Sequence, residues 1–106
     1  MIMIPKISNI DNTNFENFKH KKNSLLYVWA EWCEPCKQIS PIITELSSKY
    51  DNISFGKLNV DENSDIISEL SIRNIPAIIL FKDGKIINKL VGGLTSQKII
   101  DFIETN

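Results

Sequence analysis

The spacing of apolar positions changes several times along the chain, and each change marks an element of secondary structure. Leu25–Trp29 is apolar throughout, which is typical of a strand that is buried on both faces. After Pro35, apolar side chains recur at every third or fourth position, as on one face of an amphipathic helix. This stripe consists of Ile39, Ile42, Ile43, Leu46 and Tyr50. The pattern therefore predicts a buried strand followed directly by a long helix.

The remaining segments alternate between helix and strand patterns. The predicted helices are Thr13–Phe18, Ser64–Leu70 and a last helix that Thr95 caps. The predicted strands are Ile53–Val60, Ala77–Phe81 and Lys85–Val91. Asp83-Gly84 is a strong hairpin signal and joins the last two strands. This order predicts an α/β fold, in which a central mixed β-sheet is flanked by helices on both faces.

Length and composition limit the classes of protein to which the chain can belong. We expect one domain, 1–106, because the 106 residues suffice for one core and not for two. No apolar stretch approaches the roughly 18 residues of a membrane span. The net charge of −1 provides no field that would attract nucleic acid or anionic lipid. We expect a monomer that binds neither nucleic acid nor membrane. The start, Met1–Pro5, lacks the features of a secretory signal, so a cytoplasmic location is expected.

The two cysteines of the chain, Cys33 and Cys36, lie where the predicted strand gives way to the helix. Unpaired N–H groups and the positive end of the helix dipole favour a thiolate there, and so lower the pKa of Cys33. The thiolate is the nucleophile of disulfide exchange. We therefore predict a redox enzyme in which Cys33, nearer solvent, attacks a substrate disulfide. Cys36, on the inner stripe, then resolves the mixed disulfide, and Pro35 stiffens the ring.

Other uses of two cysteines at this spacing fit the sequence less well. A structural zinc site needs four ligands, and His20 is the only histidine. Covalent haem attachment needs a histidine directly after the second cysteine, where Lys37 stands. Two unreactive core thiols would not be expected to meet at a helix start. We therefore expect no metal and no bound cofactor.

Several separate segments resemble the thioredoxin family, and together they extend over nearly the whole chain. They are Trp29–Lys37 with the pattern W-A-E-W-C-x-P-C-K, Lys57–Asp61, Ile75-Pro76, and Gly92 after Lys82–Gly84. The resemblance implies the thioredoxin fold and the reduction of protein disulfides by dithiol exchange. It further implies electrons from NADPH through a flavin-dependent thioredoxin reductase, and a role in electron transport and cell redox homeostasis.

The same resemblance implies a docking surface for substrates beside the cysteines. The Ile75-Pro76 bond would be cis, and the backbone of Ile75 would pair with an extended substrate segment. The predicted members of this flat, mostly apolar surface are Trp32, Pro35, Ile75, Pro76 and Gly92. Trp29 and Lys37 would support the cysteine pair. Without the resemblance, Pro76 also fits a strand edge, Gly92 a plain turn and Trp29 an ordinary core position.

Two residues depart from the family pattern. Glu34 stands where the family usually has glycine, and its carboxylate should raise the pKa of Cys33 and make the protein more reducing. Tyr27 stands where the family usually has a buried Asp, which with the lysine matching Lys57 helps to deprotonate the resolving cysteine. Tyrosine is a poor base near neutral pH. We predict that Cys36 is activated through water or Lys57, and that resolution is slower or shifted to higher pH.

Two other functions stay open on the sequence. An oxidant or isomerase of the same fold would act in an exported compartment, against which the leaderless start argues. A non-catalytic binding subunit would use the docking surface without turnover. Replacing Cys36 by serine separates the binding subunit from the enzyme, since only an enzyme would then stall as a mixed disulfide.

Overall fold

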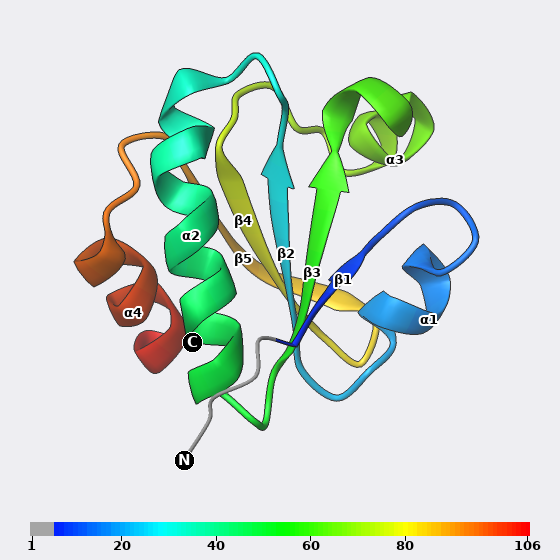
Figure 1. Ribbon diagram of the computed structural model, residues 1–106. Coiled ribbons are helices and arrows are strands. Elements are labelled where there is room, and N and C mark those ends of the chain that lie inside the picture. Colours follow the sequence, from blue (N-terminus) through cyan, green and yellow to red (C-terminus); the bar gives the residue numbers. More distant parts are fainter. Residues whose placement is uncertain (1–5) are drawn as a thin grey trace.

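A five-stranded mixed sheet carries helices on both of its faces in the computed structural model, which describes residues 6–106 (Figure 1). The strands are β1 (Ile7–Asn9), β2 (Ser24–Trp29), β3 (Ser54–Asn59), β4 (Ala77–Lys82) and β5 (Lys85–Val91). The helices are α1 (Phe15–Lys19), α2 (Glu34–Lys49), α3 (Ser64–Glu69) and α4 (Ser96–Thr105), with a 3₁₀ turn η1 at Val60–Glu62. The predicted α/β class and mixed sheet are confirmed.

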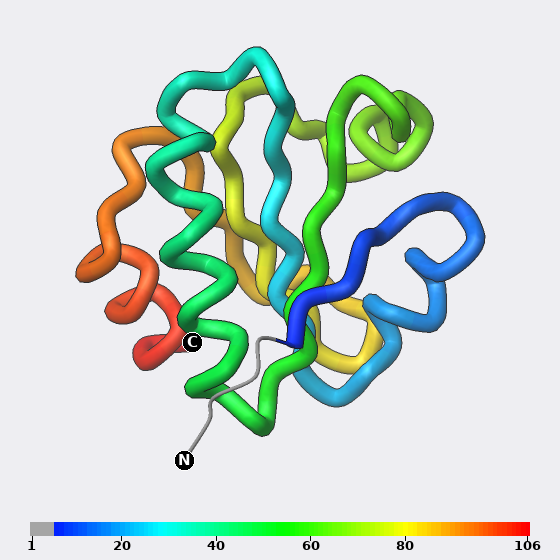
Figure 2. The backbone as a smooth tube through the Cα atoms, viewed as in Figure 1, coloured from blue at the N-terminus to red at the C-terminus, as the bar shows by residue number. Residues whose placement is uncertain are grey.

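The strand order β1-β3-β2-β4-β5 brings the ends of three strands to one edge of the sheet. β1 and β2 both run parallel to β3, whereas β4 is antiparallel to β2 and to β5. Figure 2 shows the early strand β1 beside β3, which is distant in the sequence. Because Trp29 pairs with Asn59 and Val28 with Ala77, the carboxyl ends of β2 and β3 meet the amino end of β4. The segments that follow Trp29 and precede Ala77 therefore lie at this edge.

The central strand β2 supplies a core to each face of the sheet. Leu25 and Tyr27 pack with residues of α2 and α4, whereas Leu26 and Val28 pack with residues of α1 and α3. Successive side chains of a strand point to opposite faces of the sheet. When both faces are covered, neither set of alternating side chains is exposed to solvent. All four side chains are buried, as the unbroken apolar run predicts.

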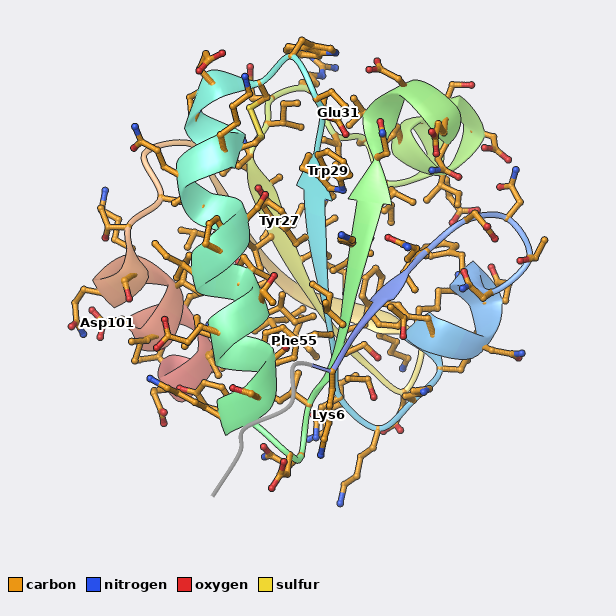
Figure 3. The ribbon with its side chains drawn as sticks, viewed as in Figure 1. Lys6, Tyr27, Trp29, Glu31, Phe55 and Asp101 are labelled. Atoms are coloured by element: carbon orange, nitrogen blue, oxygen red, sulfur yellow. A yellow bond between two sulfur atoms is a disulfide. The ribbon has the colours of Figure 1, made fainter. Side chains whose placement is uncertain are left out.

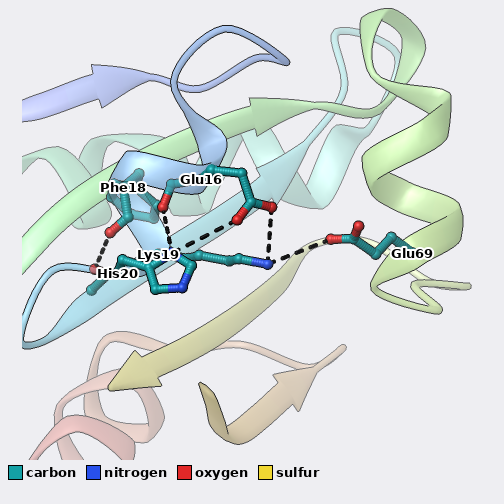
Figure 4. A network of polar contacts seen from close by, with 6 residues as sticks. Glu16, Phe18, Lys19, His20 and Glu69 are labelled. Atoms are coloured by element: carbon teal, nitrogen blue, oxygen red, sulfur yellow. Dashed lines mark hydrogen bonds and ion pairs between the residues drawn. The ribbon is translucent and has the colours of Figure 1, made fainter. Parts of the chain in front are cut away.

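The two short helices on the second face are linked by one lysine (Figure 4). Lys19 Nζ lies 3.1 Å from Glu16 Oε1 within α1 and 3.9 Å from Glu69 Oε2 in α3. The same ammonium lies 5.2 Å from the centre of the Phe15 ring. Ion pairs to exposed carboxylates contribute only about 0–1 kcal/mol each, so burial of Phe15 and Phe18 contributes more to holding α1 in place.

Several predicted boundaries are wrong by one or two residues, and polar side chains explain two of them. The helix expected from Thr13 begins at Phe15, because Thr13 N and Asn14 Oδ1 both bond to Asp11 in a turn before it. The strand expected to reach Val60 ends at Asn59, whose side-chain oxygen accepts a hydrogen bond from Asp61 N and starts η1.

The amino-terminal part of the sheet was not predicted at all. β1 contains only three residues, Ile7–Asn9, which is too short for a period of two to stand out.

The prediction that rests on Met1–Pro5 lies outside the described residues. Among helices of residues 6–106, none combines the length and apolarity that crossing a membrane requires.

Candidate active site

Cys33 and Cys36 form a disulfide at the first turn of α2. Their Cα atoms are 5.2 Å apart. Cys33 is the N-cap residue, with extended backbone, and its Sγ accepts a hydrogen bond from Cys36 N at 3.3 Å. Pro35 occupies the first turn, where a missing N–H leaves no helical bond unmade. This position gives the Cys33 sulfur the backbone donor and the dipole end that stabilise a thiolate.

The two cysteines differ less in exposure than the sequence suggested. Cys33 is 4% exposed and Cys36 is 1% exposed, so the expectation that Cys33 lies nearer solvent holds only by a small margin. Both pack with Ala30 and against partly buried side chains from three segments, which are Trp29, Val60 and Ile75. The larger difference is positional, since Cys33 precedes the helix and Cys36 belongs to its inner face.

The outer side of the disulfide carries an exposed ion pair. Lys37 Nζ lies 2.9 Å from Glu34 Oε1, and the two side chains are 60% and 80% exposed. The hydrogen bond to Glu34 and the attraction of its carboxylate raise the pKa of Lys37, with a smaller contribution from Glu31. The negative charge that Glu34 adds beside Cys33 is therefore largely compensated by its neighbour.

The inner side of the disulfide carries neutral hydroxyl groups. Tyr27 is buried on β2 between the sheet and α2 (Figure 3). Its hydroxyl lies 3.1 Å from Cys36 O and 2.9 Å from Ser40 Oγ. Burial raises the pKa of Tyr27, against a smaller opposite effect of the bond with Ser40. The phenol is therefore a protonated hydrogen-bond donor at neutral pH and does not act as a base.

Lys57 lies beside Tyr27 on the neighbouring strand β3. The two residues are paired in register between β2 and β3, and they line a cavity of about 190 Å³ together with Ser40 and Thr44. Lys57 Nζ lies 5.8 Å from the centre of the Trp29 ring and makes no ion pair within residues 6–106. A separate groove reaches Cys36, and Lys57 does not line it.

Trp29 ends β2 and packs against both the main core and the cysteine pair. Trp29 therefore contacts the cysteine pair, and its supporting role stays a prediction. Within residues 6–106 its Nε1 is the one buried side-chain polar atom that lacks a hydrogen-bond partner. Figure 3 shows Trp29 at the end of the strand, between Tyr27 and Glu31.

The residues predicted to form a docking surface for substrates differ in their exposure. The Ile75-Pro76 bond is cis, and Gly92, with φ of +66°, donates a hydrogen bond from its N–H to Pro76 O at 3.2 Å. Trp32 is 64% exposed, whereas Ile75 is half-buried and Pro76 is buried. Pro76 therefore contributes to this surface through its backbone, whose carbonyl bonds to Gly92, because its ring is buried and exposes little apolar area.

Sequence reasoning missed two residues that contact the predicted ones. Asp61 Oδ2 accepts a hydrogen bond from Trp32 Nε1 at 3.0 Å, although the two are separated by 29 residues and no local pattern links them. Ser40 contacts Cys36 O at 2.9 Å. Its spacing of four residues from Cys36 was a usable signal, because such residues are neighbours on one face of a helix.

A disulfide at a helix N-terminus, beside a cis proline and a glycine that leaves the backbone accessible, defines a class of proteins, the thiol–disulfide oxidoreductases. The thioredoxin family model matches residues 6–105. The chain therefore belongs to the thioredoxin family, and it is a thiol–disulfide oxidoreductase of the protein-disulfide-reductase type. The resemblance of its separated motifs to this family is confirmed.

Individual relatives agree with this assignment over the whole domain. The chain is 36% identical over 104 residues to a thioredoxin of Buchnera aphidicola from Acyrthosiphon pisum, covering 95% of this chain and 96% of that protein. It is 35% identical to a thioredoxin of Staphylococcus saprophyticus, covering 92% and 95%. The crystal structure of Malassezia sympodialis thioredoxin superposes with a TM-score of 0.91 at 30% identity, covering 99% and 94%.

Proposed function

We propose that the protein reduces disulfides of other proteins, with Cys33 as the nucleophile and Cys36 as the resolving cysteine. The observation that carries this assignment is the hydrogen bond from Cys36 N to Cys33 Sγ, because Cys33 alone stands outside the helix with a backbone donor on its sulfur. Cys36 is buried on the inner face of α2 and is the poorer first nucleophile toward a bulky substrate.

The proposed reaction has two steps. The Cys33 thiolate attacks one sulfur of the substrate disulfide, forms a mixed disulfide and releases the first substrate thiol. Cys36 then loses its proton and attacks Cys33 Sγ, so that the bond from Cys33 to the substrate breaks and the second thiol leaves. Two electrons pass to the substrate, and the protein is left with the Cys33–Cys36 disulfide.

The substrate would dock on the surface around the cysteines. Trp32, Pro35 and Gly92 are exposed there, and the half-buried Ile75 would offer its backbone to an extended segment of the substrate. The bond to Asp61 holds the Trp32 ring in place. Recognition through backbone and flat apolar surface gives broad specificity for unfolded or extended disulfide-containing segments.

Thioredoxin reductase is the proposed electron donor, supplied by NADPH, and the protein would work as a monomer in the cytoplasm without a bound cofactor. It would serve electron transport and cell redox homeostasis there. Family membership supports this assignment of partners. Among residues 6–106, no group of three or more His, Cys, Asp or Glu side chains could hold a metal ion.

Trapping tests the roles of the two cysteines. Incubation of Cys36→Ser with a protein disulfide should accumulate a mixed disulfide through Cys33, detectable by mass and reversed by dithiothreitol. Cys33→Ser should trap far less, because Cys36 is enclosed. Equal trapping by the two variants, or more by Cys33→Ser, would overturn the assignment.

The reduction potential tests the direction of the reaction. A value at or below about −250 mV is typical of reductases of this family, whereas about −180 mV is typical of disulfide isomerases. We expect the lower value, measured in a graded dithiol–disulfide buffer through tryptophan fluorescence. The higher value would favour the oxidant or isomerase.

A further inference from the structure

Resolution requires a Cys36 thiolate, yet among residues 6–106 no carboxylate on a strand of the sheet lines the hollows beside this cysteine. The titratable or charged side chains around it are Cys33, Glu34 and Lys37 on α2 or at its cap, Glu31 before the helix, Tyr27 on β2 and Lys57 on β3. Glu34 and Lys37 pair with each other and are largely exposed. The inner contacts of Cys36 are instead the hydroxyls of Tyr27 and Ser40.

These two hydroxyls form a triangle with the Cys36 carbonyl. Tyr27 OH and Ser40 Oγ lie 3.1 and 2.9 Å from Cys36 O, and 2.9 Å from each other. The triangle contains three oxygens and two protons, so one carbonyl has two alternative side-chain donors. Tyr27 alone can satisfy it, which leaves the Ser40 hydroxyl free to turn about its own Cα–Cβ bond without stranding a buried acceptor.

Ser40 also shares a helix face and a groove with Cys36. It follows Cys36 by four residues in α2, and helical side chains lean toward the N-terminus, over the preceding turn. Both residues line a groove of about 390 Å³, whose rim includes the exposed side chains Glu31 and Lys37. A proton that leaves Cys36 can therefore reach solvent through this groove, which Ser40 also lines.

We propose that Ser40 donates a hydrogen bond to the Cys36 thiolate during resolution, while Tyr27 takes over the Cys36 carbonyl. The Cys36 proton passes to water in the groove, and its electron pair stays on sulfur. That sulfur bonds to Cys33 Sγ, the Cys33–substrate bond breaks, and the departing substrate sulfur takes a proton from water. Ser40 keeps its own proton throughout. A hydroxyl that donates to the charged form favours it, which supplies part of what the missing base would do.

The test measures resolution directly and rests on the proposed roles of the cysteines. Reduced protein is mixed with 5,5′-dithiobis(2-nitrobenzoate) in a stopped-flow instrument, where attack by Cys33 and then by Cys36 each releases one coloured thiolate. The rate of the second phase rises with pH, and we expect Ser40→Ala to shift the midpoint of this pH dependence upward by about one unit. Below the midpoint, the second phase should then be about tenfold slower than in the parent. The first phase should not change, and Ser40→Thr, which keeps the hydroxyl, should restore the second.

Two further variants separate this role from a general effect on the helix. Thr44→Val removes the next hydroxyl along α2, which donates a hydrogen bond to Ser40 O. Thr44 lines both the groove beside Cys36 and the cavity beside Lys57, and its replacement should leave both phases unchanged. Tyr27→Phe, made in the parent protein, should shift the pH midpoint of the second phase upward, because Ser40 must then keep its hydrogen bond to the Cys36 carbonyl. In the Ser40→Ala background it should add nothing.

Each contrary result has a distinct meaning. An unshifted second phase in Ser40→Ala, an equal shift in Thr44→Val, or additive shifts for Tyr27 and Ser40 would overturn the role of Ser40. Absence of the Cys33 mixed disulfide in Cys36→Ser would instead overturn the proposed roles of the cysteines.

Discussion

The two sides of the Cys33–Cys36 disulfide offer different chemistry to the sulfur atoms. On the outer side, Glu34 and Lys37 carry full charges, but they pair with each other in solvent. On the inner side, Tyr27 and Ser40 carry no charge, and their hydroxyls bond to the Cys36 carbonyl, Tyr27 from a buried position and Ser40 from a partly buried one. Charges in solvent are screened by water and salt, whereas buried hydrogen bonds are not.

This contrast ranks the two departures from the family pattern. Glu34 introduces a charge whose effect on Cys33 is reduced by Lys37 and by exposure. Tyr27 places a phenol, whose pKa burial raises, on the inner side, where the family usually has a carboxylic acid. Each departure changes the formal charge by one unit, and we expect the exchange of a carboxylate for a neutral phenol to have the larger consequence for resolution.

The largest effect should follow from returning a carboxylate to the inner side. We expect Tyr27→Asp to lower the free energy of unfolding by about 3 kcal/mol at pH 7, because it removes a buried ring and buries a charge. Resolution should nevertheless become faster near neutral pH, since the carboxylate can accept the Cys36 proton. Chemical denaturation and the second phase of thiolate release measure the two effects.

Tyr27→Asn is the matched control for that variant, because it has the same size and no base. It should lose stability without accelerating resolution. Burial raises the pKa of the introduced carboxyl above its unfolded value near 4, so the unfolded state ionises first as pH rises. The free energy of unfolding of the Asp variant should therefore fall further below that of the Asn variant as pH rises above about 4. An unchanged pH–rate profile in Tyr27→Asp would show that the inner side does not control resolution.

A smaller effect should appear at alkaline pH. Burial raises the pKa of Tyr27, so its contribution to stability is complete below its unfolded pKa near 10 and is lost as pH rises through the folded value. Tyr27→Phe should cost about 1 kcal/mol at neutral pH and should flatten the loss of stability above pH 10. The control is Tyr50→Phe, because Tyr50 is less buried and bonds to the exposed Glu104. A steeper alkaline loss in Tyr27→Phe than in the parent would contradict this account.

Local rules were sufficient for the parts of the molecule that local contacts build. Cys33 and Cys36 at a helix start, Pro35 in the first turn and the Thr95 cap all follow from neighbours a few residues apart. The unbroken apolar run of β2 likewise predicted burial on both faces, because that property depends on the strand itself. These elements are where sequence and structure agree most closely.

Contacts across the fold could not be obtained in this way. The bond from Trp32 to Asp61 joins residues that are adjacent only once β2 and β3 are paired. Ser40 had the right spacing from Cys36, yet a helical serine commonly bonds to the carbonyl four residues before it and so carries no special signal. Its significance depends on Tyr27, which reaches the same carbonyl from another element.

The smallest expected effect belongs to the outer side of the disulfide. Glu34→Gly should raise the reduction potential by about 10 mV, because removing the carboxylate and freeing the Lys37 ammonium both favour the Cys33 thiolate. Glu34→Gln is the matched control, since it removes the same charge and keeps the length of the side chain. Equilibration of each variant with a graded dithiol–disulfide buffer measures the shift.

Salt distinguishes this effect from those of the inner side. Because Glu34 and Lys37 are exposed, the shift should shrink between about 0.01 and 1 M salt, as the screening length falls from about 30 to 3 Å. The Ser40→Ala shift in resolution should persist over the same range, since Ser40 acts through a hydrogen bond and carries no charge. A Glu34→Gly potential below that of the parent would reverse the sign assigned to the carboxylate. A salt-independent shift would mean that Glu34 acts through the geometry of the ring and not through its charge.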